Sequence, residues 1–184
     1  MKKRIISIET SIGQRQGFVA DLMRMGKANT KGYVCLAQVH MLVEAWKDEG
    51  YAKVVNEAAI VVPNGMPVAM AVKILHGVPQ QRLSGVELLP ELFKAAQAEQ
   101  LSIFFVGGTR TLLDYTWEYC TQQFPDLDIA GTYCPKSKII SAEESLEIID
   151  KIAEARPNFV VVTLDCPEQE NGWHPYRGRL VLVC

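Results

Sequence analysis

Residues 58–85 read AAIVVPNGMPVAMAVKILHGVPQQRLSG, and this stretch decides the predicted fold. The apolar run at residues 60–62 is short and β-branched, which is typical of a strand buried on both faces. A turn at 63–65 ends that run, and a helical pattern begins at Met66 with a proline in its first turn. Apolar residues recur at helical spacing through Leu75, so we expect this helix to pack back on the sheet.

Asn64 lies between the end of the strand and the start of the helix. In open α/β sheets, ligands bind at this edge. An amide side chain donates and accepts hydrogen bonds, although asparagine before glycine is also a common turn former. Arg82 follows in a loop, where a guanidinium either meets an anionic ligand or is simply solvated.

The remaining chain continues the alternation of strands and helices. Buried strands are predicted at residues 5–8, 33–37, 103–106, 129–133 and 159–164, and helices at 14–27, 41–46, 51–58, 87–98, 109–124 and 141–155. This alternation predicts a single α/β domain over residues 1–184. We expect a Rossmann-like, mostly parallel sheet with helices on both faces.

Composition excludes several classes of function. The net charge of −2 gives no support to nucleic-acid binding, and no apolar run approaches the ~20 residues that span a bilayer. The five cysteines show no CxxC spacing, and the three histidines show no zinc spacing, so we predict neither a disulfide framework nor a metal site. The reducing cytoplasm is the predicted compartment.

Two further features stand at predicted strand ends. The pair Gly107 and Gly108 separates a strand from a helix, where backbone N–H groups bind phosphate or where the chain merely turns tightly. His40 follows the strand at 33–37, so we expect it at the same sheet edge as Asn64. It either caps the following helix or, as an imidazole that titrates near neutral pH, acts as a general base.

Five segments carry a resemblance to a known family. AAIVVPNGMPVAM and RLSGVEL resemble the ADxVxPDGMPLVW and RVxGxDL signature of the WecG/TagA/CpsF glycosyltransferases (glycosyltransferase family 26). CLAQVHMLVEAW is similar to the family's CxANVHMxVEA, and IAGTY to its IVGTY. Residues 166–180 resemble its GCPKQExWMAEHRGRL.

The resemblance implies an inverting transfer of an N-acetylmannosamine-type sugar from a UDP-sugar to a polyprenyl-linked acceptor. Such a transfer would serve cell-surface polysaccharide synthesis at the cytoplasmic membrane face, with peripheral membrane association and without a metal or cofactor. By this match, Asn64 occupies the position of the catalytic base. The match also predicts substrate contacts at Gln38, Arg82, Thr132 and Gln169, to which the strand-end pair Gly107 and Gly108 adds a candidate phosphate contact.

Several departures from the family pattern favour an alternative. The family's aspartate is Asn64, its asparagine is Gln38, its lysine is Glu168 and its tryptophan is Gly172. These changes predict a degraded homologue that binds a nucleotide-sugar or a protein partner without turnover. A dinucleotide oxidoreductase is a third reading, which the missing GxGxxG disfavours.

The chain stops at Cys184, where members of the family usually continue. We therefore expect it to lack the family's C-terminal portion, which would leave one side of the sheet open and apolar surface exposed near residues 180–184. Such surface would lead to a homo-oligomer.

Overall fold

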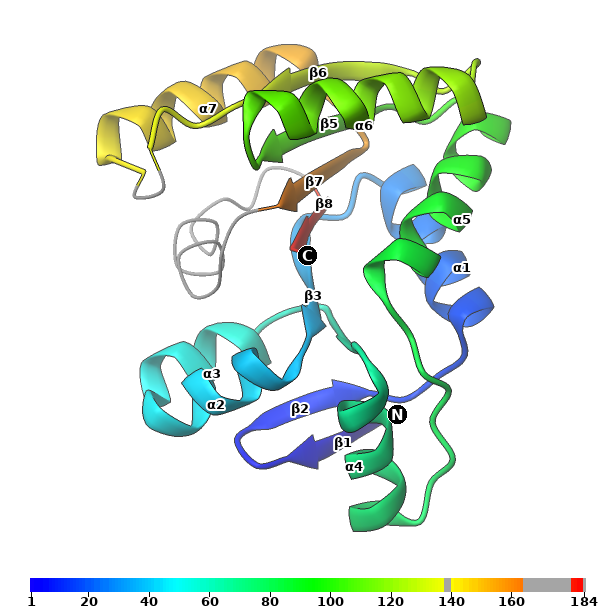
Figure 1. Cartoon of the computed structure of the whole chain (residues 1–184), viewed down its shortest axis with the longest axis vertical. Coiled ribbons are helices and arrows are strands. Elements are labelled where there is room, and N and C mark those ends of the chain that lie inside the picture. The colour runs from blue at the N-terminus through cyan, green and yellow to red at the C-terminus, as the bar shows by residue number, and fades with distance from the viewer. Residues whose placement is uncertain (138–139, 164–179, 184) are drawn as a thin grey trace.

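The computed structural model describes residues 1–137, 140–163 and 180–183. Six parallel strands form one sheet in the order β4-β3-β8-β7-β5-β6. These strands are β3 (Gly32–Ala37), β4 (Ile60–Pro63), β5 (Ile103–Gly107), β6 (Ile129–Tyr133), β7 (Phe159–Thr163) and β8 (Leu180–Val183). The predicted α/β class with a parallel sheet is confirmed (Figure 1).

Helices cover both faces of the sheet. One face packs α1 (Arg15–Lys27), α5 (Gly85–Ala98) and α6 (Arg110–Gln123). The other packs α2 (Val39–Lys47), α3 (Glu49–Asn56), α4 (Met66–His76) and α7 (Ala142–Ala155). The two apolar layers arise because successive residues of a strand point to opposite faces.

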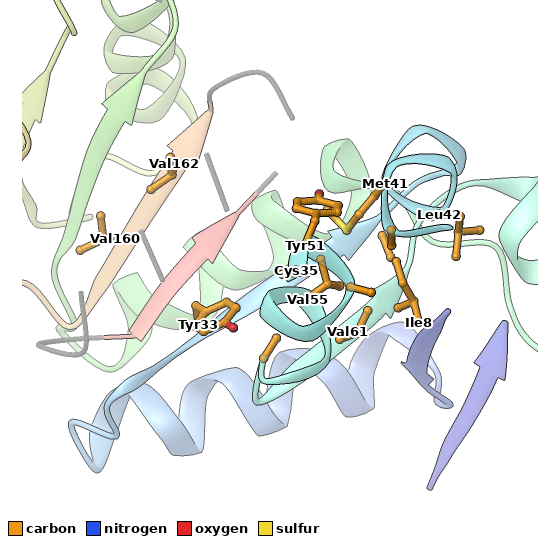
Figure 2. Close-up of a cluster of buried hydrophobic side chains, with 14 of the residues drawn as sticks. Ile8, Tyr33, Cys35, Met41, Leu42, Tyr51, Val55, Val61, Val160 and Val162 are labelled. Carbon is orange, nitrogen blue, oxygen red and sulfur yellow. The ribbon is translucent and has the colours of Figure 1, made fainter. Parts of the chain in front are cut away.

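Strand β3 shows this alternation. Its Val34 and Leu36 join the cluster formed with α1 and α5. Tyr33 and Cys35 face the other way, toward α3, as Figure 2 shows, and the Tyr33 hydroxyl donates to the Val54 carbonyl in that helix. A strand with apolar residues on both faces therefore sits in the interior of the sheet, as the sequence predicts.

Helix α1 approaches the sheet closely at Gly26. A Cβ atom at this position would lie 2.2 Å from Cζ of Phe159, the first residue of β7. Phe159 is fully buried. Only glycine therefore allows the ring and the helix to occupy their present places.

The predicted strand at residues 5–8 is wrong. Residues 2–11 instead form an antiparallel hairpin outside the main sheet, with strands β1 (Lys2–Ile5) and β2 (Ile8–Ser11). Ile5 and Ile8 close the turn, and Ile6 adopts a φ of 55° within it. Ile5 and Ile8, the apolar residues that suggested a single strand, are both buried. They lie at the end of β1 and the start of β2, where they face each other across the hairpin.

The hairpin covers the free edge of β4. Strand β2 packs against β4, and the Ser11 hydroxyl accepts a hydrogen bond from the Val61 N–H at 3.3 Å. This contact satisfies a backbone donor that an exposed edge strand would present to solvent.

Helix α4 packs less completely than its sequence pattern predicts. Val68, Ala69 and Val72 are buried, but Leu75 is 59% exposed, so the expectation for Leu75 is wrong. The reason is that α4 packs against β1 of the hairpin and does not lie flat over the sheet.

Strand β8 lies between β3 and β7 and pairs with both. This strand is therefore interior to the sheet, while the expected exposure of apolar surface near residues 180–184 stays a prediction. The outer strands of the sheet are β4 and β6, which come from the middle of the chain. Cys184 lies outside the described residues.

Candidate functional site

The candidate site begins where β3 and β4 end together. Ala37 pairs with Pro63, and the Asn64 N–H donates to the Ala37 carbonyl at 2.9 Å. Gln38 and Asn64 therefore follow neighbouring strands at one carboxyl edge. Asn64 is half-buried and Gln38 is exposed.

The loop before α5 joins this edge. Asn64 forms an isolated parallel bridge with Leu83, and the Gly65 N–H donates to the Leu83 carbonyl at 2.6 Å. Leu83 is fully buried, which anchors the loop. Arg82, the residue before it, is thereby held next to the end of β4.

Arg82 is paired with Glu87 in the first turn of α5. The Ser84 hydroxyl donates to the other oxygen of the same carboxylate at 2.8 Å. The Ser84 hydrogen bond, followed by the positive charge of Arg82, lowers the pKa of Glu87. The carboxylate is therefore ionised at neutral pH and orients the guanidinium.

His40 is the second residue of α2 and is exposed. Its Nε2 lies 3.6 Å from Oε1 of Glu44, one helical turn later. Glu44 also binds Lys47 at 2.9 Å. This separation is longer than a hydrogen bond, so Glu44 acts on His40 through its charge, which favours the protonated imidazole that a general base becomes.

Two helix N-termini meet at the same edge. Helix α2 begins after Gln38 and α4 begins after Gly65, and neither residue caps its helix with a side-chain hydrogen bond. Neither first turn contains an acidic residue. Gly65 adopts a φ of 88°, which suits glycine and turns the chain sharply into α4. The positive ends of both helices favour an anion here.

Gly107, Gly108 and Thr132 lie at the same edge but farther along the sheet. Strand β5 is four strands from β4, so about 19 Å of sheet separates Gly107 from Asn64. Thr132 lies on the neighbouring strand β6 and pairs with Phe105 of β5. Gly108 adopts a φ of 68° before α6. The ends of β8 and β7 lie between the two groups of residues.

Gln169, Glu168 and Gly172 lie outside the described residues. Within the described ranges, no three His, Cys, Asp or Glu side chains gather closely enough to hold a metal ion. In the same part of the chain, no helix has the length and apolar character needed to cross a membrane. A cavity of about 320 Å³ borders Ile60 at the opposite end of β4 and is separate from the candidate site.

Sequence reasoning missed the acidic partners of the site. Glu87 and Ser84 hold Arg82, and Glu44 faces His40. Both signals were present in the spacing, since Ser84 and Glu87 form a capping-box pattern and Glu44 lies four residues after His40.

Comparisons with known proteins identify relatives of the chain. Residues 3–183 match the model of the glycosyl transferase WecG/TagA/CpsF family. A Bacillus spizizenii protein named N-acetylglucosaminyldiphosphoundecaprenol N-acetyl-beta-D-mannosaminyltransferase is 30% identical over 81% of this chain and 56% of its own length. Proteins of the same name from Bacillus subtilis and Staphylococcus aureus are 28% and 22% identical, over 72% and 75% of this chain and 50% and 52% of their own lengths. The chain thus spans about half the length of the curated relatives it matches.

Proposed function

The chain belongs to the glycosyl transferase WecG/TagA/CpsF family, and from this we propose that it transfers an N-acetylmannosamine-type sugar from a UDP-sugar. The proposed acceptor is N-acetylglucosamine linked through a diphosphate to a polyprenol, the acceptor type in the names of the relatives. The product would serve cell-surface polysaccharide synthesis. Residues 1–184 would act as one domain, at the cytoplasmic face of the membrane.

The convergence of Gln38, Asn64 and Arg82 supports this proposal most directly. Main-chain hydrogen bonds from Asn64 to Ala37 and from Gly65 to Leu83 tie the three residues to one sheet edge. An amide, a guanidinium and two helix N-termini are suited to a sugar bearing a diphosphate. Gly107, Gly108, Thr132 and Gln169 would bind the nucleotide.

The proposed mechanism is a direct displacement at the anomeric carbon. The acceptor hydroxyl attacks this carbon while the bond to the departing UDP oxygen breaks, so the configuration inverts. Arg82 and the N-termini of α2 and α4 stabilise the negative charge on the leaving diphosphate. His40, beside the Glu44 carboxylate, takes the proton from the acceptor hydroxyl.

Asn64 supports a second candidate function. A side-chain amide cannot accept a proton near neutral pH, so the family's carboxylate chemistry is absent at this position. If no other residue acts as the base, the chain binds the nucleotide-sugar or a protein partner without turnover.

One experiment separates the two functions. The protein is mixed with UDP-N-acetylmannosamine and a short-chain lipid diphosphate N-acetylglucosamine, and the disaccharide lipid and released UDP are measured. Calorimetry with UDP and with the UDP-sugar is run in parallel. Disaccharide formation supports the transferase, and binding without product supports the second candidate. Absence of both would contradict the proposed function.

A further inference from the structure

The outward face of α4 is as apolar as its inward face. Val68 and Val72 are fully buried, whereas Met66, Met70 and Ile74 are 53%, 52% and 75% exposed. These three exposed residues recur every fourth position, so they form one line along the helix, which we call the α4 stripe. A helix that is apolar on all sides is normally covered on all sides.

Basic groups border the α4 stripe. Lys73 is exposed on α4 itself, and β1, which packs against α4, exposes Arg4, whereas the Nζ of Lys2 donates to the Ala58 carbonyl before β4. His76 fixes this arrangement, since its Nε2 lies 2.7 Å from the Arg4 carbonyl oxygen. Glu9 faces Arg4 across the hairpin.

Glu9 of β2 is the one acidic residue in the hairpin and in residues 58–86, the segments that build this surface. Residues 1–8 and 58–86 contain no Asp or Glu, although the whole chain has a net charge of −2. Positive charge is therefore concentrated on the part of the molecule that also exposes the apolar stripe.

We propose that the α4 stripe docks on an anionic lipid bilayer, with α4 lying parallel to the membrane plane. Met66, Met70 and Ile74 would enter the boundary between headgroups and acyl chains, and Lys73 and Arg4 would contact lipid phosphates. A second copy of the chain fits this surface poorly, because a two-fold contact would bring the same basic groups together.

This docking would place the candidate site at the membrane surface. Helix α4 begins two residues after Asn64, so the sheet edge with Asn64 lies next to the docked helix. Figure 1 shows α4 and the hairpin together at one end of the molecule, with α6 and α7 at the other. The idea that this orientation helps the site reach a lipid-linked acceptor rests on the proposed function. The docking of α4 on the bilayer does not rest on it.

Vesicle co-sedimentation tests the proposal without any sugar substrate. Vesicles contain either equal parts of phosphatidylcholine and phosphatidylglycerol or phosphatidylcholine alone. We expect wild-type protein to bind the anionic vesicles, and Ile74→Glu and Met70→Glu to weaken binding roughly tenfold or more. Lys73→Glu should weaken binding about fivefold or more, and only to the anionic vesicles. Leu146→Glu is the matched control, because Leu146 is 63% exposed on distant α7.

Several outcomes would overturn the proposal. These are a wild-type protein that does not sediment with anionic vesicles, α4 variants that sediment equally well, and a Leu146→Glu variant that loses as much binding. A wild-type dimer that Ile74→Glu dissociates, without lipid binding, would assign the stripe to a second copy. The α4 variants are also assayed with a water-soluble acceptor, so that a loss of membrane binding is distinguished from a loss of transferase activity. Circular dichroism verifies that each variant is folded.

Discussion

The identity of residue 64 decides how the candidate site can work. If Asn64 occupies the position of the base, Asn64→Asp restores a carboxylate next to the end of β4. General base catalysis typically contributes ~10²–10⁴-fold, so the transfer rate should rise by a large factor within that range. Initial rates of UDP release with both substrates present check this. An unchanged or lower rate in a folded Asn64→Asp protein would remove residue 64 from base catalysis.

Among the described residues that follow β3 and β4, His40 is the candidate that can take the proton while residue 64 is an amide. Because an imidazole accepts a proton only in its neutral form, a base mechanism through His40 predicts a rate that rises with pH. His40→Ala should abolish that rise and most of the rate while UDP-sugar binding survives. His76→Ala is the control, because His76 contacts the hairpin away from the site. A flat pH–rate profile would exclude His40.

Glu87 positions Arg82, so its effect should appear in donor binding. Glu87→Gln should weaken UDP affinity about twofold to fivefold, the size expected for an exposed ion pair. Glu91→Gln is a matched control on the same helix, since Glu91 pairs with Arg15 at 2.7 Å. Because the pKa of Glu87 is lowered, its contribution to UDP affinity is present at neutral pH and is lost as pH falls through that lowered value. Calorimetry across this acid range should show the UDP affinities of wild type and Glu87→Gln becoming equal. A difference in affinity that persists in acid would contradict the positioning role.

At the scale of elements, the contact between α1 and β7 leaves no room for a side chain at residue 26. Gly26→Ala forces a methyl group against the buried Phe159 ring, so it should destabilise the fold by about 1–3 kcal/mol. Gly17→Ala in the same helix meets no atom within 4 Å and should stabilise the helix by about 0.5–1 kcal/mol. Urea unfolding of both variants measures the difference. Equal stability of the two would show that α1 can move away from β7.

Most elements could be predicted from the sequence because their patterns are local. The β-branched runs at β4 and β7 and the proline at the start of α4 each specify an element within a few residues. The hairpin was missed because a buried residue at each end of a turn, Ile5 and Ile8, looks like one apolar strand. The partner of Arg82 could have been read from the capping pattern, but the order of the strands could not, since it depends on contacts between distant segments.

At the scale of the whole molecule, the hairpin protects the sheet. Deleting residues 1–12 removes the buried Ile5, Ile8 and Thr10 and uncovers the edge of β4. We expect lower thermal stability and more self-association than in the wild type, because unpaired edge strands pair with other chains. Light scattering and thermal melting measure both effects. Ser11→Ala, which removes one hydrogen bond worth about 1 kcal/mol, should change stability without adding association. A truncated chain as stable and as dispersed as the wild type would show that the hairpin is dispensable.

The central position of β8 has a consequence for synthesis on the ribosome. Strand β3 is made well before β8, yet Cys35 pairs with Val183 across the middle of the sheet. At typical elongation rates, roughly 7 to 30 s pass between the two. Near the end of this interval, once β7 has been made, the nascent chain can hold two separate half-sheets, β4-β3 and β7-β5-β6, each with one edge that β8 fills in the folded protein. The nascent protein should therefore depend on chaperones until β8 has left the exit tunnel.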